Sequence, residues 1–278
     1  MPITRRFVFR GNASPIGGWI SHPRHVIIDS PGASSLTVAG GRSQGSLGRR
    51  KFDEFASVRS AETSAQGVFD DRRQVRALVL AGASLEALTT TTTVKVAVDG
   101  VAIARDPQLR IAELRATMTG ASPRADGGEP SIRPGSIRIA GVSIGGHTLL
   151  VDYDTKVFAD YGTHTDFRKA AAAPAFASDH PGLFLGSAAA AEQPALSTSG
   201  DTIYTAIATN LRWKGARYPD SSIDRNLVVA PGFGKVYFGE LLITPFSRRL
   251  TLVRAVLGSP DGGEVACAEV ETNGSWYP

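Results

Sequence analysis

The C-terminal part of the chain reads Lys235-Val-Tyr-Phe-Gly-Glu-Leu-Leu-Ile-Thr244, then Arg248-Arg-Leu-Thr-Leu-Val-Arg-Ala-Val-Leu257, and then a third apolar run at residues 264–271. Clusters of Pro, Ser, Asp and Gly separate the three runs. Apolar runs bounded by such turn residues are typical of β-strands. We therefore predict a three-stranded antiparallel meander over residues 234–272, with strands of about ten residues, near the upper end of the usual range.

Two further hairpins are predicted from glycine-containing turns. Residues 94–99 and 101–103 flank Asp99-Gly100, and residues 137–144 and 147–153 flank Gly145-Gly146. Both central residues of a type I′ turn need positive φ, and therefore these pairs favour tight hairpins. Residues 55–69 read as a long polar strand, and the five consecutive Thr at residues 89–93 predict a strand with one exposed hydroxyl face.

The β pattern stops between residues 154 and 200. The segment at residues 166–173 has helical propensity and ends before Pro174, and residues 183–192 indicate a second short helix. We interpret residues 154–200 as a partly helical insertion into a β scaffold. Such an insertion either carries functional residues or covers an open sheet edge or barrel end.

These patterns predict an all-β fold, an antiparallel β-sandwich or β-barrel with a partly helical insertion around residues 154–200. We expect one β-rich domain over residues 1–278, since an independent unit at residues 200–278 would be small for its own stability. The alternative division places one unit at residues 1–153 and another at residues 200–278.

Composition excludes several classes of protein. Of the 278 residues 42% are hydrophobic, and no apolar run approaches the roughly 20 residues that span a bilayer. A single cysteine excludes an internal disulfide framework and a Cys-based zinc finger, and we expect Cys267 to be a buried, inert thiol. Residues 1–10 contain no stretch of signal-peptide length, which predicts a cytoplasmic protein, or an extracellular one if a signal has been removed.

The net charge of +4 is unevenly distributed. Residues 1–115 carry 16 Lys and Arg against 10 Asp and Glu, whereas residues 141–210 carry 3 against 7. Nucleic-acid binding proteins cluster basic residues with interleaved aromatics, and here the short basic clusters lie beside acidic residues. Specific nucleic-acid binding is therefore not expected, and neither a membrane span nor a cofactor is predicted.

Several short motifs fail the test of their context. Gly-x-Ser-x-Gly occurs at residues 41–45 and 141–145, but no helix is expected after either serine, as a hydrolase elbow requires. The glycines at residues 232–239 are expected to open a strand, because the Gly-Lys-Ser/Thr ending of a phosphate loop is missing. His22 and His25 are interpreted as part of a turn before a strand. No metal site is predicted.

The densest polar cluster lies where the insertion begins. If the protein is an enzyme, we predict catalytic roles for Asp152, Asp154, Tyr161, His164 and Asp166. Asp152 and Asp154 are two residues apart and would share one face of a strand. His164 would transfer the proton, since its ordinary pKa lies closest to neutral, and a nearby Asp would orient it. A solvated strand end is the structural alternative for these residues.

Aromatic residues are sparse, and two of them are candidates for ligand binding. Trp213 and Tyr218 lie close together in the sequence, and Trp276 and Tyr277 are close to the end. Exposed rings of this kind bind carbohydrates, although core packing uses the same residues. The Thr- and Ala-rich strands, with a segment such as residues 139–146, are similar to β-rich surface domains of high-GC bacteria, a likeness that implies no function.

The leading hypothesis is a non-catalytic all-β protein that acts by self-assembly or macromolecular binding. It follows from long strands, from the absence of a catalytic motif in a suitable context, and from the capacity of sheet edges to add partner strands. A homo-oligomer or a protein partner is therefore expected. The alternative is a small-molecule enzyme or ligand-binding protein on a β-barrel scaffold, with its site under the insertion at residues 154–200.

Overall fold

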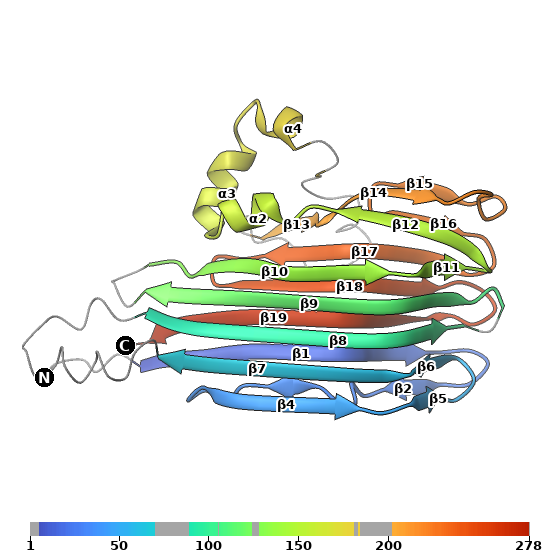
Figure 1. Ribbon diagram of the computed structural model, residues 1–278, viewed down its shortest axis with the longest axis horizontal. Helices are drawn as coiled ribbons and strands as arrows, with labels where there is room; N and C mark the ends of the chain where they lie inside the picture. The colour runs from blue at the N-terminus through green and yellow to red at the C-terminus, as the bar shows by residue number, and fades with distance from the viewer. Residues whose placement is uncertain are drawn as a thin grey trace, which may run out of the picture.

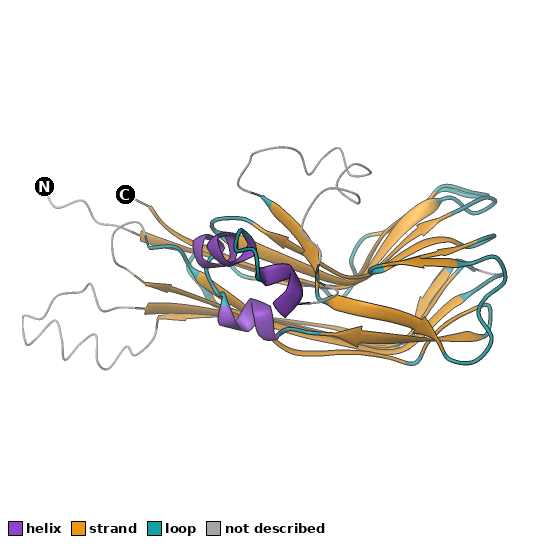
Figure 2. Cartoon of the chain, turned by 90° about the horizontal axis from the view of Figure 1, so that it is seen from above, coloured by secondary structure: helices purple, strands orange, loops and turns teal. Residues whose placement is uncertain are grey.

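The chain forms two large antiparallel sheets that pack together (Figure 1). Of the two predicted architectures, a β-sandwich and a β-barrel, this arrangement corresponds to the β-sandwich. The computed structural model describes residues 6–69, 89–104, 106–123, 128–180, 183 and 202–277. Strands account for 65% of the structure and helices for 7%, which confirms the predicted all-β class. Seen from above, the strands lie in two layers, and the helices lie across one edge of them (Figure 2).

Sheet 1 contains the predicted C-terminal meander, which is confirmed. Its first and last long strands, β1 and β19, pair from Arg6 opposite Tyr277 to Ile20 opposite Gly263. Along the sheet the order is β15 (Ser222–Asp224), β16 (Leu227–Ala230), β17 (Gly234–Ile243), β18 (Ser247–Leu257), β19 (Gly263–Tyr277), β1 (Arg6–Ile20) and β2 (Val26–Ile28), with β13 (Ile203–Ala206) beside β17 and β3 (Ser34–Ser35) beside β1.

Sheet 2 contains the second predicted hairpin, at Gly145-Gly146, where both glycines have positive φ values of 54° and 83°. Its order is β14 (Ala208–Trp213), β12 (His147–Tyr153), β11 (Val142–Ile144), β9 (Leu109–Pro123), β8 (Thr89–Ile103), β6 (Ala56–Val58) and β5 (Arg50–Phe52); β10 (Ser131–Ala140) pairs with β9, β7 (Ser60–Phe69) with β8, and β4 (Gly41–Leu47) with β7. The polar strand expected at residues 55–69 is thus β6 and β7.

The hairpin predicted at Asp99-Gly100 is wrong. Strand β8 continues to Ile103, and its pairing with β9 passes from Asp99 opposite Glu113 to Val101 opposite Ile111. Gly100 has the expected positive φ of 64°, but it forms an irregularity inside one strand rather than a turn. The continued strand buries Val101 and Ile103 in the core, which a reversal at Gly100 would not achieve.

The main hydrophobic cluster of the described residues lies between the sheets and includes residues from both. In β8 the buried residues alternate, with Val94, Val96 and Val98 facing inward. Cys267 belongs to this core, and burial raises the pKa of its thiol to about 12. The prediction of a buried cysteine is therefore confirmed, and its thiol stays protonated at neutral pH.

The predicted helical insertion is confirmed within the described residues. It contains α2 (Lys156–Asp160), α3 (His164–Ala171) and α4 (Phe176–Asp179). Helix α3 begins two residues earlier than expected because the Thr163 hydroxyl accepts a hydrogen bond from the Asp166 backbone N–H at 3.0 Å and caps the helix. Of the second predicted helix, only Leu183 is described, without regular structure; the rest lies outside the described residues.

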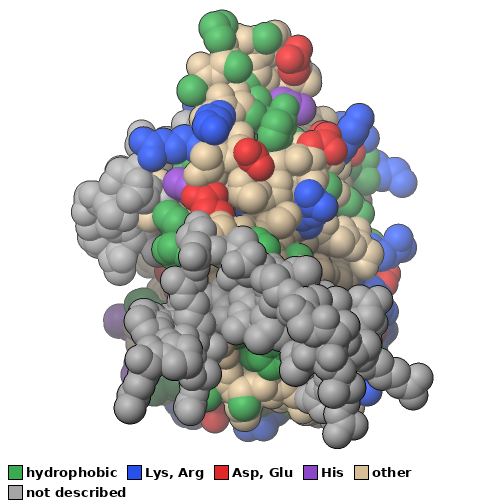
Figure 3. Space-filling model, turned by 90° about the vertical axis from the view of Figure 1, so that its left-hand side faces the viewer, with side chains coloured by type: hydrophobic (Ala, Val, Ile, Leu, Met, Phe, Trp, Pro, Cys, Tyr) green, Lys and Arg blue, Asp and Glu red, His purple; other side chains and the backbone are tan. Residues whose placement is uncertain are grey.

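The helices cover the edge of sheet 2. The backbone N–H of Ile132 in β10 donates to the Gly162 carbonyl at 2.9 Å, and the aromatic side chains of Phe158, Phe167 and Phe176 are buried in the core. In the space-filling view of this end, hydrophobic, acidic and basic side chains mix over the helices (Figure 3). Within the described residues, the insertion thus covers an open edge, the simpler of its two predicted roles.

A buried arginine attaches the insertion to sheet 1. Arg248 in β18 is 1% exposed, and its guanidinium donates to the carbonyl oxygens of Phe158 at 3.0 Å, Tyr161 at 2.6 Å and Thr163 at 3.5 Å. Burial, together with the charge of Arg133, lowers the pKa of Arg248 to about 10. The three carbonyl groups therefore solvate a charge that sits inside the protein.

Candidate functional site

The two carboxylates at the start of the insertion have separate partners. Asp152 lies in β12, and its Oδ2 accepts hydrogen bonds from the Asn210 amide at 3.0 Å and from the Arg212 guanidinium. These bonds lower the pKa of Asp152, Asn210 contributing more than Arg212. Asp154 lies beyond the strand, and its Oδ1 accepts from the Lys156 backbone N–H at 2.7 Å, at the start of α2. The ladder between β12 and β14 is irregular after Asp152, so the regular strand that would align the two carboxylates ends here.

The remaining candidate catalytic residues lie around α3. Tyr161 is half-buried and gives its carbonyl to Arg248, whereas Asp166 is exposed in the first turn of α3. His164 is buried, and its Nε2 has no hydrogen-bond partner in the described part of the chain. The sequence predicted that a nearby Asp would orient this imidazole. Within the described residues, no Asp side chain forms a hydrogen bond with it. Among the described residues, no group of three His, Cys, Asp or Glu side chains could hold a metal ion.

We expect His164→Leu to change the free energy of unfolding by no more than about 1 kcal/mol, because an apolar side chain removes a buried nitrogen that lacks a partner. Urea denaturation measures the change. Phe167→Ala in the same helix is the positive control, since truncation of a fully buried phenylalanine costs about 3–5 kcal/mol. A loss of several kcal/mol in His164→Leu would contradict the expectation.

The two aromatic residues predicted to bind a ligand do come together. The rings of Trp213 and Tyr218 are 6.5 Å apart between centroids, and His147 lies edge-on to both, at 6.5 Å and 5.6 Å. Tyr218 donates its hydroxyl to the Pro231 carbonyl at 2.9 Å. Both rings are half-buried, so this cluster packs around the turn between β11 and β12 and leaves little ring surface exposed. The side chains of Trp276 and Tyr277 lie outside the described part of the structure.

A larger polar surface lies on the outward side of sheet 2. Strand register aligns outward-facing side chains of β4, β7, β8, β9 and β10 in rows that cross the sheet. Most of these side chains are hydroxyls, amides or charged groups. We call this surface the outer polar face and define it by three rows: Arg42, Gln66, Thr93, Thr119 and Arg133; Gln44, Ser64, Lys95, Thr117 and Ser136; and Ser46, Glu62, Ala97, Arg115 and Arg138.

Part of the outer polar face is fixed by an ionic network. The two carboxylate oxygens of Glu113 lie 2.5 Å from Nε of Arg115 and 2.5 Å from Nε of Arg138. Nη2 of Arg115 also lies 3.5 Å from Oδ1 of Asp99. The hydrogen bonds from Arg115 and then Arg138 hold the pKa of Glu113 below its usual value. The charges at this end of the face therefore compensate one another.

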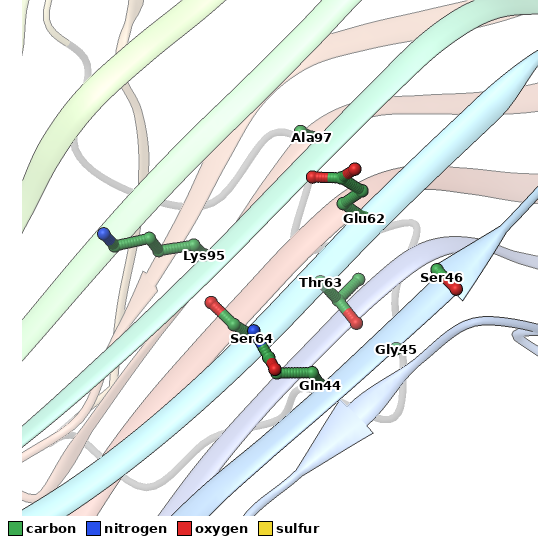
Figure 4. Close-up of a pocket in the computed structure, with 8 residues that line it drawn as sticks. All are labelled: Gln44, Gly45, Ser46, Glu62, Thr63, Ser64, Lys95 and Ala97. Atoms are coloured by element: carbon green, nitrogen blue, oxygen red, sulfur yellow. The ribbon is translucent and has the colours of Figure 1, made fainter.

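A shallow groove of about 490 Å³ crosses the outer polar face beside β4 (Figure 4). Figure 4 shows Gln44 and Ser64 side by side on neighbouring strands, with Lys95 next to Ser64 on β8 and Glu62 further along β7. The short side chain of Ala97 leaves room between the longer ones. The lining residues are Gln44, Gly45, Ser46, Glu62, Thr63, Ser64, Lys95 and Ala97. They include donors, acceptors, one cation and one carboxylate but no aromatic ring, so the groove suits hydrogen bonding to a polar segment.

Strand β4 forms the edge of this face. All seven of its residues pair with β7, and within the described residues no other strand bonds to its backbone. None of the seven is buried, and Figure 1 shows β4 at the margin of the molecule. In an antiparallel pair every second residue points its N–H and C=O away from the partner strand. Strand β4 therefore presents backbone groups that another strand could pair with, whereas edge strands β2, β5 and β15 have only three residues each.

A second polar cluster lies on the outward side of sheet 1. Arg254 makes a bidentate pair with Glu240, at 2.6 Å and 2.7 Å, and the Tyr204 hydroxyl donates to the same carboxylate. The guanidinium carbon of Arg254 also lies 4.1 Å from the Tyr237 ring centroid. Nη1 of the same guanidinium lies 3.7 Å from Oε1 of Glu264. A hollow of about 150 Å³ adjoins the cluster. Sequence reasoning missed these residues, although charged groups at outward positions of apolar strands were a visible signal.

Electrostatics show that the cluster is tightly paired. Burial raises the pKa of Tyr204, and the charge of Glu240 adds to this effect. For Arg254, burial alone would lower the pKa, but the hydrogen bonds and charge of Glu240 outweigh it and raise the pKa. Arg254 therefore keeps its charge within this hydrogen-bonded pair.

The fold and the outer polar face define a two-sheet antiparallel β protein with an exposed edge strand. The chain belongs to the family described as Domain of unknown function (DUF8256), whose model matches residues 7–217. The matched residues include every described strand of sheet 2 and the helices, and they end before β15. No curated protein and no solved structure matches the chain. None of the helices in the described ranges is both long and apolar enough to cross a membrane.

Proposed function

We propose that the protein is a non-catalytic binding protein whose partner is another protein chain. An extended segment of the partner adds to the exposed edge of β4 and lays alternate side chains along the groove of the outer polar face. The observation that carries this proposal is the seven-residue edge strand beside a groove lined by Gln44, Ser64 and Lys95. In strand addition, main-chain hydrogen bonds supply the affinity and neighbouring pockets supply the specificity.

The chemistry of the outer polar face supports strand addition more than docking of a flat surface. Stable interfaces between flat surfaces concentrate buried aromatic, Arg and aliphatic anchors at their centre. The groove offers hydroxyl, amide and charged groups instead. Backbone hydrogen bonds contribute about 0.5–1.5 kcal/mol each, and a seven-residue edge provides several of them.

The alternative function, a ligand site under the insertion, has less support from the described residues. Phe158 and Phe167 stack with ring centroids 5.5 Å apart, and Phe176 packs edge-on against Phe167 at 6.0 Å. These rings are part of the hydrophobic core. They favour a covering role for the helices over a pocket beneath them.

A displayed library of random twelve-residue peptides, selected on the immobilised protein, tests the proposal. We expect selected peptides to bind in solution, and we expect binding to weaken at least tenfold in one of two variants, Ser43→Pro and Gln44→Pro. Neighbouring residues of β4 point their N–H groups in opposite directions, so only one of the two prolines faces the partner. That variant keeps the unfolding midpoint of the wild type, because its lost N–H was not paired with β7.

The matched control is Thr117→Ala, on the same face but two strands further from the edge than Ser64. It should leave the peptide affinity unchanged, whereas Lys95→Ala in the groove should reduce it. Fluorescence anisotropy with labelled peptides measures all four variants. Peptides whose affinity is indifferent to both prolines and to Lys95→Ala would overturn the proposal.

A further inference from the structure

We propose that the strand added to β4 is β4 of a second copy of this chain, paired antiparallel about a two-fold axis at Gln44. The inference rests on the proposed function, since it names the partner of that same edge. The pairing would join the two copies of sheet 2 into one continuous sheet. Closed two-fold dimers of this type use the same surface of both subunits, so the edge must be complementary to itself.

The sequence of β4, Gly41-Arg-Ser-Gln-Gly-Ser-Leu47, is self-complementary in this register. Centring the axis on Gln44 overlaps all seven residues of the strand, and it places Arg42 opposite Ser46 of the second copy. Gln44 meets Gln44, and its amide can both donate and accept across the axis. Arg42 is the one charged residue of the strand, so no like charges oppose each other, which in an antiparallel pair would be destabilising.

The edge of β4 lacks most of the features that usually prevent such pairing, and Arg42 is its one charged side chain. Sheet edges are commonly protected by proline, inward-pointing charges, bulges or very short strands. Strand β4 contains no proline, and its ladder with β7 runs from Gly41 opposite Gly67 to Leu47 opposite Ala61 without a register shift. The comparable edge of β10, by contrast, is covered by the insertion through the bond between Ile132 and Gly162.

The geometry also keeps the grooves accessible. A two-fold axis perpendicular to the sheet leaves the outer polar face of both copies on the same side. The rows that contain Gln44, Ser64 and Lys95 would then continue across the seam, and the two grooves of about 490 Å³ would adjoin there. The contact is mainly one strand edge in width, so we expect a monomer–dimer equilibrium that varies with protein concentration rather than a permanent dimer.

Cysteine substitution of the full chain tests the register directly. At the two-fold axis the Cα atoms of Gln44→Cys in the two copies would lie about 5 Å apart, within disulfide reach. Ser64→Cys is the matched control. It faces the same side one strand further from the axis, where three strand spacings of about 4.8 Å separate the copies by roughly 14 Å. The native Cys267 is buried and does not compete.

We expect mild oxidation to convert Gln44→Cys into a covalent dimer on non-reducing gels, while Ser64→Cys stays monomeric under the same conditions. Equal cross-linking of both variants, or of neither, would overturn the inference. A charge-swap experiment adds a second readout by sedimentation velocity. Gln44→Lys and Gln44→Glu should each weaken self-association severalfold, because like charges would face each other, and an equimolar mixture of the two should restore it.

The outcomes separate this inference from the proposed function. If the library peptides bind the β4 edge while the wild type sediments as a monomer at every concentration and Gln44→Cys does not cross-link, then strand addition stands and self-pairing is wrong. If the peptides are indifferent to the β4 variants and the cross-link is also absent, both proposals fail.

Discussion

Arg254→Ala is expected to lower the free energy of unfolding by about 3–5 kcal/mol. The side chains of Arg254 and Glu240 are only 8% and 7% exposed, and the pair is bidentate. Removing the guanidinium leaves a buried carboxylate that still accepts a hydrogen bond from the Tyr204 hydroxyl but has lost its bidentate cation. It also removes the cation above the Tyr237 ring. Burying a charge without a counter-charge is among the most costly changes that a single substitution can make.

Arg212→Ala is the matched comparison, since it also removes the arginine of an ion pair with a carboxylate, here that of Asp152. In that pair the Arg212 and Asp152 side chains are 53% and 46% exposed, and exposed pairs contribute about 0–1 kcal/mol. Urea denaturation of both variants and the wild type measures the difference. A loss below about 1 kcal/mol in Arg254→Ala, or equal losses in the two variants, would show that the Glu240 pair is not an important source of stability.

Arg248→Ala is expected to cost about 3 kcal/mol or more and to loosen the insertion. The change removes hydrogen bonds to the carbonyls of Phe158, Tyr161 and Thr163, and hydrogen bonds to charged donors contribute about 1.5–3 kcal/mol each. Part of the loss is offset because the buried guanidinium itself is costly, as its lowered pKa shows. The expected net effect is therefore smaller than the sum of the three bonds.

Arg249→Ala is the control for Arg248, because it is the next residue and its side chain lies on the opposite, outward side of β18. Surface substitutions of this kind change stability by about 0.5 kcal/mol or less. Limited proteolysis provides a local readout: residues 155–180 should become cleavable in Arg248→Ala well before the sheets unfold. If the two variants show equal cleavage, Arg248 does not anchor the insertion.

Local patterns predicted much of the fold. The meander, the turn at Gly145-Gly146 and the helical insertion each depend on residues close in sequence, so periodicity and turn chemistry were sufficient. The Asp99-Gly100 hairpin was wrong because a glycine with positive φ can lie inside a continuous strand as well as at a turn. What decided between them was the pairing of β8 with β9 on both sides of Gly100, together with the burial of Val101 and Ile103.

The candidate site was less accessible to sequence reasoning, because it depends on which strands are neighbours. The exposed hydroxyl face expected at residues 89–93 corresponds to alternate threonines of β8, while Thr90 and Thr92 are buried. The alignment of Gln44 with Ser64 and of Ser64 with Lys95 requires the register of three strands from separate parts of the chain. A single sequence reports alternation along one strand but not its partner, and for that reason the groove was not predicted.

The pairing of β1 with β19 determines how the protein responds to mechanical load. The two strands run antiparallel, with Arg6 opposite Tyr277, so a force that pulls these two residues apart acts across the ladder at one end. Such a force breaks the inter-strand hydrogen bonds one after another, like a zipper, instead of shearing them together. A force applied between Arg6 and Tyr277 is therefore expected to separate β1 from β19 at low force. Strands β8 and β9 in the other sheet would still be paired at that stage.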